Sequence, residues 1–240
     1  MEAKAQLSVL AAPSGAVLRK APAGLVPLII VAVLTLSPLA AMVYGAVHPG
    51  LFEGHARLSL ASLIRTYTSA ELWQSLGGTA TMAAVVALVS TAAGVALSWL
   101  VARTNVPLSR LLEMVIILPL FTSPFIASIA WFAVAAPQSG IVNVVLSGLL
   151  GRRMVLLNVT SLGGVAWVLI VHYLPYAYLF AVGALQNIDA SLEEAAYLNG
   201  SGPFVTFRRV TLPLIFPALA SSFIFIMILS AGVFSVPAVL

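Results

Sequence analysis

The sequence predicts an all-α polytopic membrane protein with about five transmembrane helices, one short cytoplasmic helix and no sixth span. Of its 240 residues, 61% are hydrophobic and only 8% are charged, and the mean hydropathy is +1.10. A soluble domain carries charge on about a quarter of its residues, so this composition excludes that class. The chain has no cysteine, which excludes a disulfide framework, a thiolate metal site and a cysteine nucleophile.

Five apolar stretches are long enough to span a membrane, since a hydrocarbon core of about 30 Å takes roughly 20 helical residues. They cover approximately residues 25–47, 79–102, 111–136, 162–185 and 214–236. The first follows Arg19 and Lys20, so a cleaved signal peptide is an alternative. The length of this stretch and its central Pro38 favour a retained span.

The distribution of Lys and Arg predicts a cytoplasmic N-terminus, because cytoplasmic loops carry the excess of these residues. The cytoplasmic set is Lys4, Arg19, Lys20, Arg103, Arg110, Arg208 and Arg209, and the outer set is Arg57, Arg65, Arg152 and Arg153. We therefore expect a cytoplasmic tail at 1–23, the first helix and an outer loop at 24–76, and the main transmembrane domain at 77–240. That domain includes a cytoplasmic loop at about 186–213.

Three features interrupt or end the spans. Pro119 and Pro124 in the third span and Pro175 in the fourth break helical hydrogen bonding; packing kinks are the simpler interpretation, and a flexible pathway element is the alternative. Residues 137–161 include GIVNVVLSGLLG, an amphipathic piece suited to the membrane surface. The chain stops at SVPAVL without a polar tail, so we expect a continuation that this sequence lacks.

The cytoplasmic loop contains the polar stretch SLEEAAYLNGSG at 191–202. Ser191 followed by Glu194 predicts a capping box, with Asp189 adding negative charge ahead of the helix. Gly200 suits the left-handed residue that ends a helix, and Pro203 prevents its resumption. Helical spacing puts Leu192, Ala195, Ala196 and Asn199 on one narrow face, flanked by Glu193 with Tyr197 and by Glu194 with Leu198.

A helix this short is marginal alone in water and needs a surface on which to dock. Helices that lie on lipid favour Lys and Arg on their polar face, whereas this one carries two glutamates. We therefore expect a protein partner in the cytoplasm. The basic residues of the chain are scattered rather than clustered, which indicates membrane topology and no binding of nucleic acid.

The same loop resembles the EAA loop of ABC importer permeases. It reads Glu194-Ala195-Ala196, three residues, Gly200, nine residues, then Val210-Thr211-Leu212-Pro213; the family has isoleucine at the position of Val210. The resemblance covers about residues 77–240. Within it, SPFIASIAW, SGIVN and HYLPYAYLF are most similar to the iron(III) branch, which borders the thiamine, polyamine and phosphonate permeases.

The resemblance implies that the short helix is a coupling helix, which docks into a groove on a separate ATP-hydrolysing subunit. It assigns this coupling to Glu193, Glu194, Ala195, Ala196, Gly200, Leu212 and Pro213, with Arg208 and Arg209 anchoring the return to the last span. It also implies a bacterial inner-membrane location, an extracytoplasmic substrate-binding protein, and a second permease half, fused or separate. The present sequence would be the first half of such a pair.

The sequence predicts no catalytic residue and no bound cofactor. It has no G-x-x-x-x-G-K-[ST] phosphate loop, so we expect ATP to bind on the partner ATPase. His48, Glu53 and His55 have no recognised metal-ligand spacing, and we expect no metal site. His172, with Tyr173 and Pro124, is a candidate pathway group, although a neutral packed histidine is the simpler interpretation.

Two other classes of membrane protein remain as alternatives. An ion-coupled carrier usually holds carboxylates near the bilayer midplane, whereas all seven acidic residues here lie outside the predicted core, with Glu113 at its edge. A non-transporting scaffold could use the short helix as a generic docking site. The sequence does not identify the transported compound.

Overall fold

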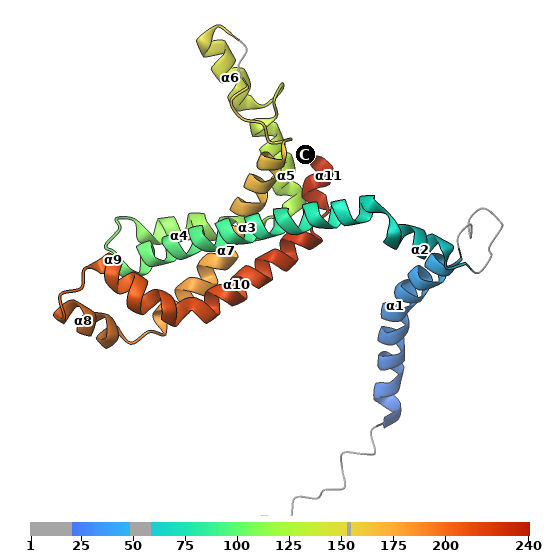
Figure 1. Cartoon of the computed structure of the whole chain (residues 1–240), viewed down its shortest axis with the longest axis horizontal. Coiled ribbons are helices and arrows are strands. Elements are labelled where there is room, and N and C mark those ends of the chain that lie inside the picture. Colours follow the sequence, from blue (N-terminus) through green and yellow to red (C-terminus); the bar gives the residue numbers. More distant parts are fainter. Residues whose placement is uncertain (1–20, 49–58, 153–154) are drawn as a thin grey trace, which may run out of the picture. The chain divides into compact units, whose positions relative to one another are not determined.

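The computed structural model describes residues 21–48, 59–152 and 155–240. Every regular element among them is a helix (Figure 1), so the predicted all-α class is confirmed. The chain divides into two units, Met1–Trp73 and Gln74–Leu240, which are described separately.

The first unit contains α1 (Ala21–Val47), α2 (Ala61–Thr68) and the start of α3 (Ala70–Arg103). Helix α1 supplies the first predicted span and stays helical through Pro27 and Pro38. The His48 ring stacks on Tyr44 with 4.1 Å between ring centroids. Glu53 and His55 lie outside the described residues, and the part of the chain described holds no group of three His, Asp or Glu that could bind a metal.

The described residues contain four helical segments long and apolar enough to cross a membrane: Pro27–Val47, Ala70–Arg103, Leu162–Gln186 and Pro203–Val239. A fifth crossing is possible where two shorter helices form a bent pair. By length and composition, the prediction of about five transmembrane helices is confirmed.

The predicted third span is divided into separate helices, whereas the simpler interpretation of its prolines was a packing kink. It consists of α4 (Ser109–Ile117), the 3₁₀ turn η2 (Leu118–Phe121) and α5 (Pro124–Ala135), with a bend of 109°. Pro124 forces Ser123 out of the helical region, to ψ 151°, because its ring clashes with the preceding residue. Ser123 then caps α5 through a 3.3 Å bond from the Ile126 N–H. Pro124 therefore starts a new helix.

Helix α7 (Leu162–Gln186) packs against both α3 and α10 (Leu212–Gly232) and continues through the buried Pro175. The closest approach to α3 is at Gly94, where an added Cβ would lie 2.5 Å from the Ala177 Cβ. Two cores result. The one toward the predicted outer side includes Val86, Leu169 and Ile226; the one toward the predicted cytoplasmic side consists of Val95, Ala181, Leu185, Ile215 and Leu219.

The predicted outer segment contains the helix expected there, α6 (Ile141–Leu150). Asn143 is only 2% exposed and makes four hydrogen bonds. Its amide nitrogen donates to the carbonyls of Ala136 and Leu157, at 2.9 and 2.7 Å. Its amide oxygen accepts from the backbone N–H groups of Leu156 and Leu157, at 2.9 and 3.1 Å. One neutral side chain therefore fastens α6 to the segment that returns toward α7.

The loop between α7 and α10 forms α8 (Ala190–Leu198), α9 (Pro203–Thr206) and the π-helical turn η3 (Phe207–Thr211). In Figure 1, α8 and α9 lie at one end of the second unit (Gln74–Leu240), and α5, α6 and α11 (Ser235–Val239) lie toward its other end. The last span was expected from about 214, but helical structure begins at Pro203. The π turn joins the two parts, since the Leu212 N–H bonds to the Phe207 carbonyl five residues back.

Candidate functional site

Helix α8 begins two residues before the predicted start. Asp189 is the N-cap, and its carboxylate accepts a 3.0 Å hydrogen bond from the Ser191 N–H. The capping box with Ser191 as N-cap is therefore wrong; an aspartate upstream caps equally well and carries a full charge beside the helix dipole. The bond from Ser191 holds the pKa of the Asp189 carboxyl below its usual value.

The C-terminus of α8 confirms the predicted role of Gly200, which has φ +80°. The Gly200 N–H bonds to the Tyr197 carbonyl at 2.9 Å, and the Ser201 N–H bonds to the Ala196 carbonyl at 3.1 Å. This pair of bonds is a Schellman motif, in which a left-handed glycine closes the helix. Pro203 does not extend α8; it occupies the first turn of α9.

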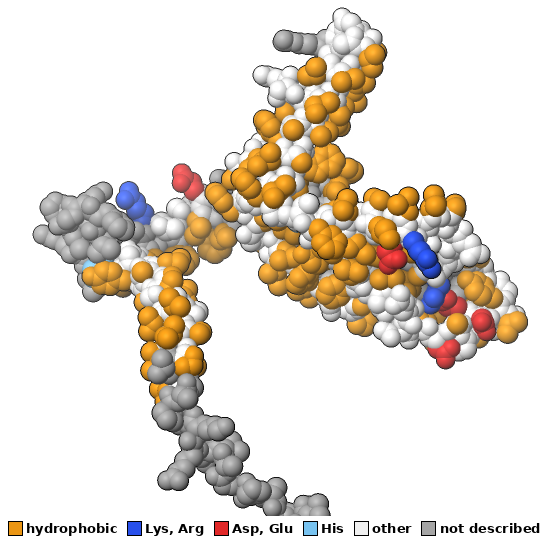
Figure 2. All heavy atoms as spheres, turned by 180° about the vertical axis from the view of Figure 1, so that it is seen from behind, with side chains coloured by type: hydrophobic (Ala, Val, Ile, Leu, Met, Phe, Trp, Pro, Cys, Tyr) orange, Lys and Arg blue, Asp and Glu red, His pale blue; other side chains and the backbone are white. Residues whose placement is uncertain are grey.

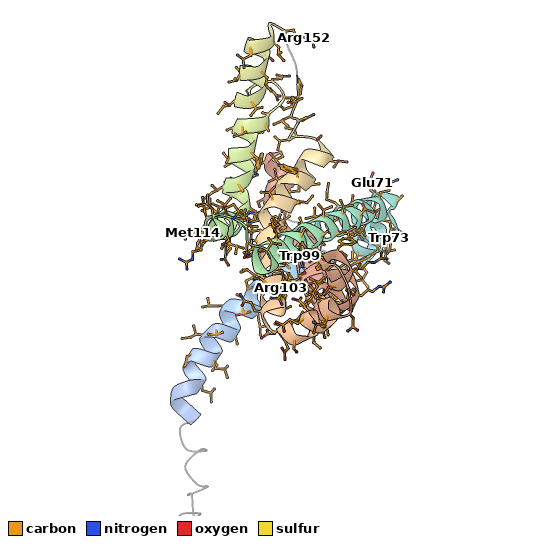
Figure 3. The ribbon with its side chains drawn as sticks, turned by 90° about the vertical axis from the view of Figure 1, so that its left-hand side faces the viewer. Glu71, Trp73, Trp99, Arg103, Met114 and Arg152 are labelled. Atoms are coloured by element: carbon orange, nitrogen blue, oxygen red, sulfur yellow. The ribbon has the colours of Figure 1, made fainter. Side chains whose placement is uncertain are left out.

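The two adjacent glutamates of α8 point in different directions. Glu193 is buried against the membrane helices, whereas Glu194 is exposed. The Glu193 Oε2 atom lies 2.9 Å from Arg103 Nε, and its Oε1 accepts a 2.8 Å bond from the Thr211 hydroxyl. The Arg103 Nε–H is not aligned as a hydrogen bond, so this contact is an ion pair. Figure 3 shows Arg103 near the end of α3, one helical turn after Trp99.

The outward face of α8 combines small and apolar side chains. Ala195 and Asn199 are exposed, Leu192 is 47% exposed and Leu198 is 90% exposed, whereas Ala196 is half-buried. Most of the face expected from helical spacing is therefore accessible. Figure 2 shows both signs of charge gathered at this end of the unit, next to surfaces dominated by hydrophobic side chains.

The return to the last span is packed on one side and open on the other. Leu212 is half-buried against the core that contains Leu185 and Ile215, whereas Pro213 is exposed. The Phe207 ring packs against Trp99 with 5.3 Å between centroids. Arg208 and Arg209 are exposed on η3. Of these residues, Leu212 and Phe207 contribute most to fixing the loop against the bundle.

The three candidate pathway residues fall into two places. His172 is 5% exposed and lies edge-on to the Tyr173 ring, with 5.3 Å between centroids. It is packed, as the simpler interpretation expected, but its Nδ1 has no hydrogen-bond partner among the described residues, whereas a bond to a backbone carbonyl was part of that interpretation. The Tyr173 hydroxyl donates to the Leu229 carbonyl at 3.4 Å, linking α7 to α10. Pro124 belongs to the break before α5.

A family comparison decides the class of this fold. Residues 94–240 match the model of the binding-protein-dependent transport system inner membrane component family. The chain belongs to this family. The match includes the C-terminal part of α3, the broken third element, α7, α8 and α10, so the candidate site lies entirely inside the region shared with the family.

The relatives of this inner-membrane component are named for two different substrates. The chain is 31% identical over 156 residues to the ferric transport system permease protein FbpB of Actinobacillus pleuropneumoniae, covering 65% of the chain and 22% of the relative. It is 36% identical over 114 residues to the sn-glycerol-3-phosphate transport system permease protein UgpA of Pectobacterium atrosepticum, covering 45% and 37%. The chain thus spans well under half the length of these relatives.

A solved structure shares the fold of this inner-membrane component. It is that of a bacterial alginate ABC transporter in complex with an alginate pentasaccharide-bound periplasmic protein. The TM-score is 0.65 at 18% identity, with 85% of this chain and 69% of that chain covered.

Two contacts at the site were missed by the sequence analysis. Arg103 was counted only as a cytoplasmic charge, and Thr211 stands between the recognised Val210 and Leu212 of the loop pattern. Glu193 was listed with Glu194 for coupling to the ATPase, but its side chain is buried against the membrane helices. Its separation from Glu194 was predictable, because successive residues on a helix differ by about 100° in direction.

Proposed function

We propose that this chain is a permease subunit of an ATP-driven ABC importer. It forms part of a membrane pathway and is driven through α8 by a separate ATP-hydrolysing subunit in the cytoplasm. The observation that carries the proposal is α8 itself: a capped nine-residue helix whose Glu194 and Ala195 are exposed at one end of the bundle. Its position within a family-matched region supports this role.

The partners follow from the same proposal. An extracytoplasmic substrate-binding protein would meet the outer end of the bundle, by analogy with the alginate transporter, whose structure is a complex with a periplasmic protein. A second permease half would complete the pathway, and His172 with Tyr173 would line it. The chain itself would bind no ATP. Its N-terminus would be cytoplasmic, in a bacterial inner membrane.

Iron(III) is the proposed substrate. The ferric relative aligns with 65% of the chain and the glycerol phosphate relative with 45%, and the sequence phrases of the third and fourth spans support the ferric branch. No candidate metal cluster occurs among the described residues, so recognition of iron is assigned to the binding protein.

The direct test is reconstitution of the full permease with its ATP-hydrolysing subunit and binding protein in liposomes. The proposal predicts uptake of radioactive iron(III) that requires ATP and persists when proton and sodium gradients are collapsed. Uptake that follows an ion gradient without ATP would support the carrier alternative. Uptake of glycerol 3-phosphate in place of iron would support the importer function but would contradict iron(III) as its substrate.

A further inference from the structure

The inner ends of the membrane helices are joined to α8 by one arginine. Arg103 is in the last turn of α3, and its Nη2 donates a 3.0 Å hydrogen bond to the Leu185 carbonyl in the last turn of α7. The same guanidinium faces the Glu193 carboxylate of α8 at 2.9 Å. Because the group is planar and rigid, these contacts fix three helix ends relative to one another.

The Leu185 contact explains why a cation is favourable at this point. Carbonyls in the last turn of a helix have no partner within the helix, and the C-terminus carries the negative end of the helix dipole. The Leu185 carbonyl accepts a long 3.4 Å bond from the Ile188 N–H. Arg103 adds a 3.0 Å bond to it, and its Nε remains beside Glu193. A lysine would supply charge, but not one rigid group that donates to the Leu185 carbonyl while it pairs with Glu193.

A second contact connects the same carboxylate to the last span. The Thr211 hydroxyl donates to Glu193 Oε1 at 2.8 Å, and Thr211 is 1% exposed. Thr211 ends η3 and directly precedes α10. Glu193 therefore binds side chains from both sides of the loop, while its neighbour Glu194 faces outward.

The chain on either side of α8 is not helical. Residues 187–189 lead into it, and 199–202 leave it through the left-handed Gly200. No continuous helix connects α8 to α7 or α10, so a displacement of α8 reaches these helices mainly through side-chain contacts. Arg103 and Glu193 are the oppositely charged pair at that contact, with side chains 25% and 11% exposed.

We propose that Arg103, together with Glu193 and Thr211, is a positioning joint that transmits movement of α8 to the inner ends of α3, α7 and α10. The inference rests on the proposed function and goes beyond it: Glu194 belongs to the surface that the ATPase contacts, and Glu193 to the mechanism that transmits the force. The partial access of water to Arg103 suits such a joint, because a fully buried ion pair that opened would leave a charge without solvation.

The test compares Glu193→Gln with Glu194→Gln in the assembled transporter, since the two substitutions make the same chemical change one residue apart. Two quantities are measured: co-purification of the ATP-hydrolysing subunit, and ATP hydrolysed per iron imported. For Glu193→Gln we expect unchanged co-purification and an ATP-to-iron ratio raised about tenfold, within the usual range of coupling between sites. For Glu194→Gln we expect reduced co-purification.

Thr211→Val keeps the ion pair and removes one donor, so it should raise the ratio less than Glu193→Gln does. A nitroxide on Ala195→Cys reports whether α8 has loosened, and all variants must show the elution profile of the unsubstituted transporter. A normal ATP-to-iron ratio in Glu193→Gln, or an equal loss of the ATPase from both glutamine variants, would overturn the joint. Failure of even the unsubstituted chain to retain an ATPase would instead overturn the proposed function, and the joint with it.

Discussion

The two ends of the helical bundle fasten their loops by opposite means. At the predicted outer end, the neutral Asn143 makes four hydrogen bonds to backbone groups and is 2% exposed. At the predicted cytoplasmic end, Glu193 is held by a charged group and a hydroxyl, and its ion-pair partner Arg103 is 25% exposed.

This difference indicates different mechanical properties. A buried amide that satisfies four backbone groups cannot rotate without leaving several of them unpaired, so the outer segment should move as one body. The Arg103 side chain is partly accessible to water, so this ion pair can separate with a smaller loss of solvation than a fully buried pair. We therefore expect the predicted outer loop to be rigid and the α8 loop to move relative to the bundle, as it should if force is applied from the cytoplasm.

The largest effect is expected for Asn143→Leu, which keeps the side-chain size but removes all four bonds. Because a hydrogen bond contributes about 0.5–1.5 kcal/mol, the loss of four should lower the free energy of unfolding by about 2–6 kcal/mol. Steric trapping in bicelles measures this quantity. Asn158→Leu is the matched control, since Asn158 is exposed and, among the described residues, its side chain bonds only to Thr160. Equal losses of stability in the two variants would contradict the structural role assigned to Asn143.

Glu193→Gln should have an intermediate effect on stability, about 1–2 kcal/mol, because hydrogen bonds to charged groups are strong but water screens this pair. Glu194→Gln should change the same free energy by less than about 0.5 kcal/mol, as is usual at exposed positions. Unfolding of both variants under identical conditions checks the difference. Equal stability would show that the inward contacts of Glu193 contribute nothing.

Gly200→Val should cost about 1–2 kcal/mol locally, because an L-residue is strained at φ +80°. Apart from Gly200 and its two chain neighbours, no described residue has an atom within 4 Å of an added Cβ, so the strain comes from the backbone conformation alone. We expect faster hydrogen exchange at Gly200 and Ser201 and slower substrate uptake, with normal membrane insertion. Gly200→Asn should do less, since asparagine tolerates this conformation. Normal uptake in the valine variant would contradict the role of this turn.

The smallest effect concerns the start of α8. Because the pKa of Asp189 is lowered in the folded protein, its cap stabilises α8 at neutral pH and is lost as pH falls below the ordinary value of 3.8 and through the folded pKa. A nitroxide on Ala195→Cys should become more mobile over that range. With Asp189→Asn in addition, the mobility of the nitroxide should depend less on pH, because this residue no longer titrates. An identical pH dependence with and without Asp189→Asn would exclude Asp189 as its source.

Local signals predicted much of this structure. Apolar length located the membrane helices, and Gly200 marked the end of α8 because few other residues accept its conformation. The start of α8 was misjudged because Asp189 and Ser191 are both good caps and only the fold selects between them. The break at Pro124 was expected as a kink, since a proline forbids a hydrogen bond but does not set the angle of the bend.

The site contacts that were missed are long-range. Arg103 and Glu193 are 90 positions apart in the sequence, and Arg103 also fits the topology rule, so nothing local identifies it as an ion-pair partner. The side of α8 that faces the bundle depends on how α7 and α10 place it. Residue spacing separates Glu193 from Glu194 but does not say which of them faces inward.

The most direct test of the central claim is a cross-link from Ala195→Cys, the exposed alanine beside Glu194, in native membranes. The natural chain has no cysteine, so every adduct reports this position. We predict an adduct with an ATP-hydrolysing subunit, identified by mass spectrometry, and none from Leu149→Cys, which is exposed on α6 at the predicted outer end. Absence of that subunit from the Ala195→Cys adducts, in membranes shown to contain the folded assembly, would contradict the claim that the ATP-hydrolysing subunit contacts the permease at α8.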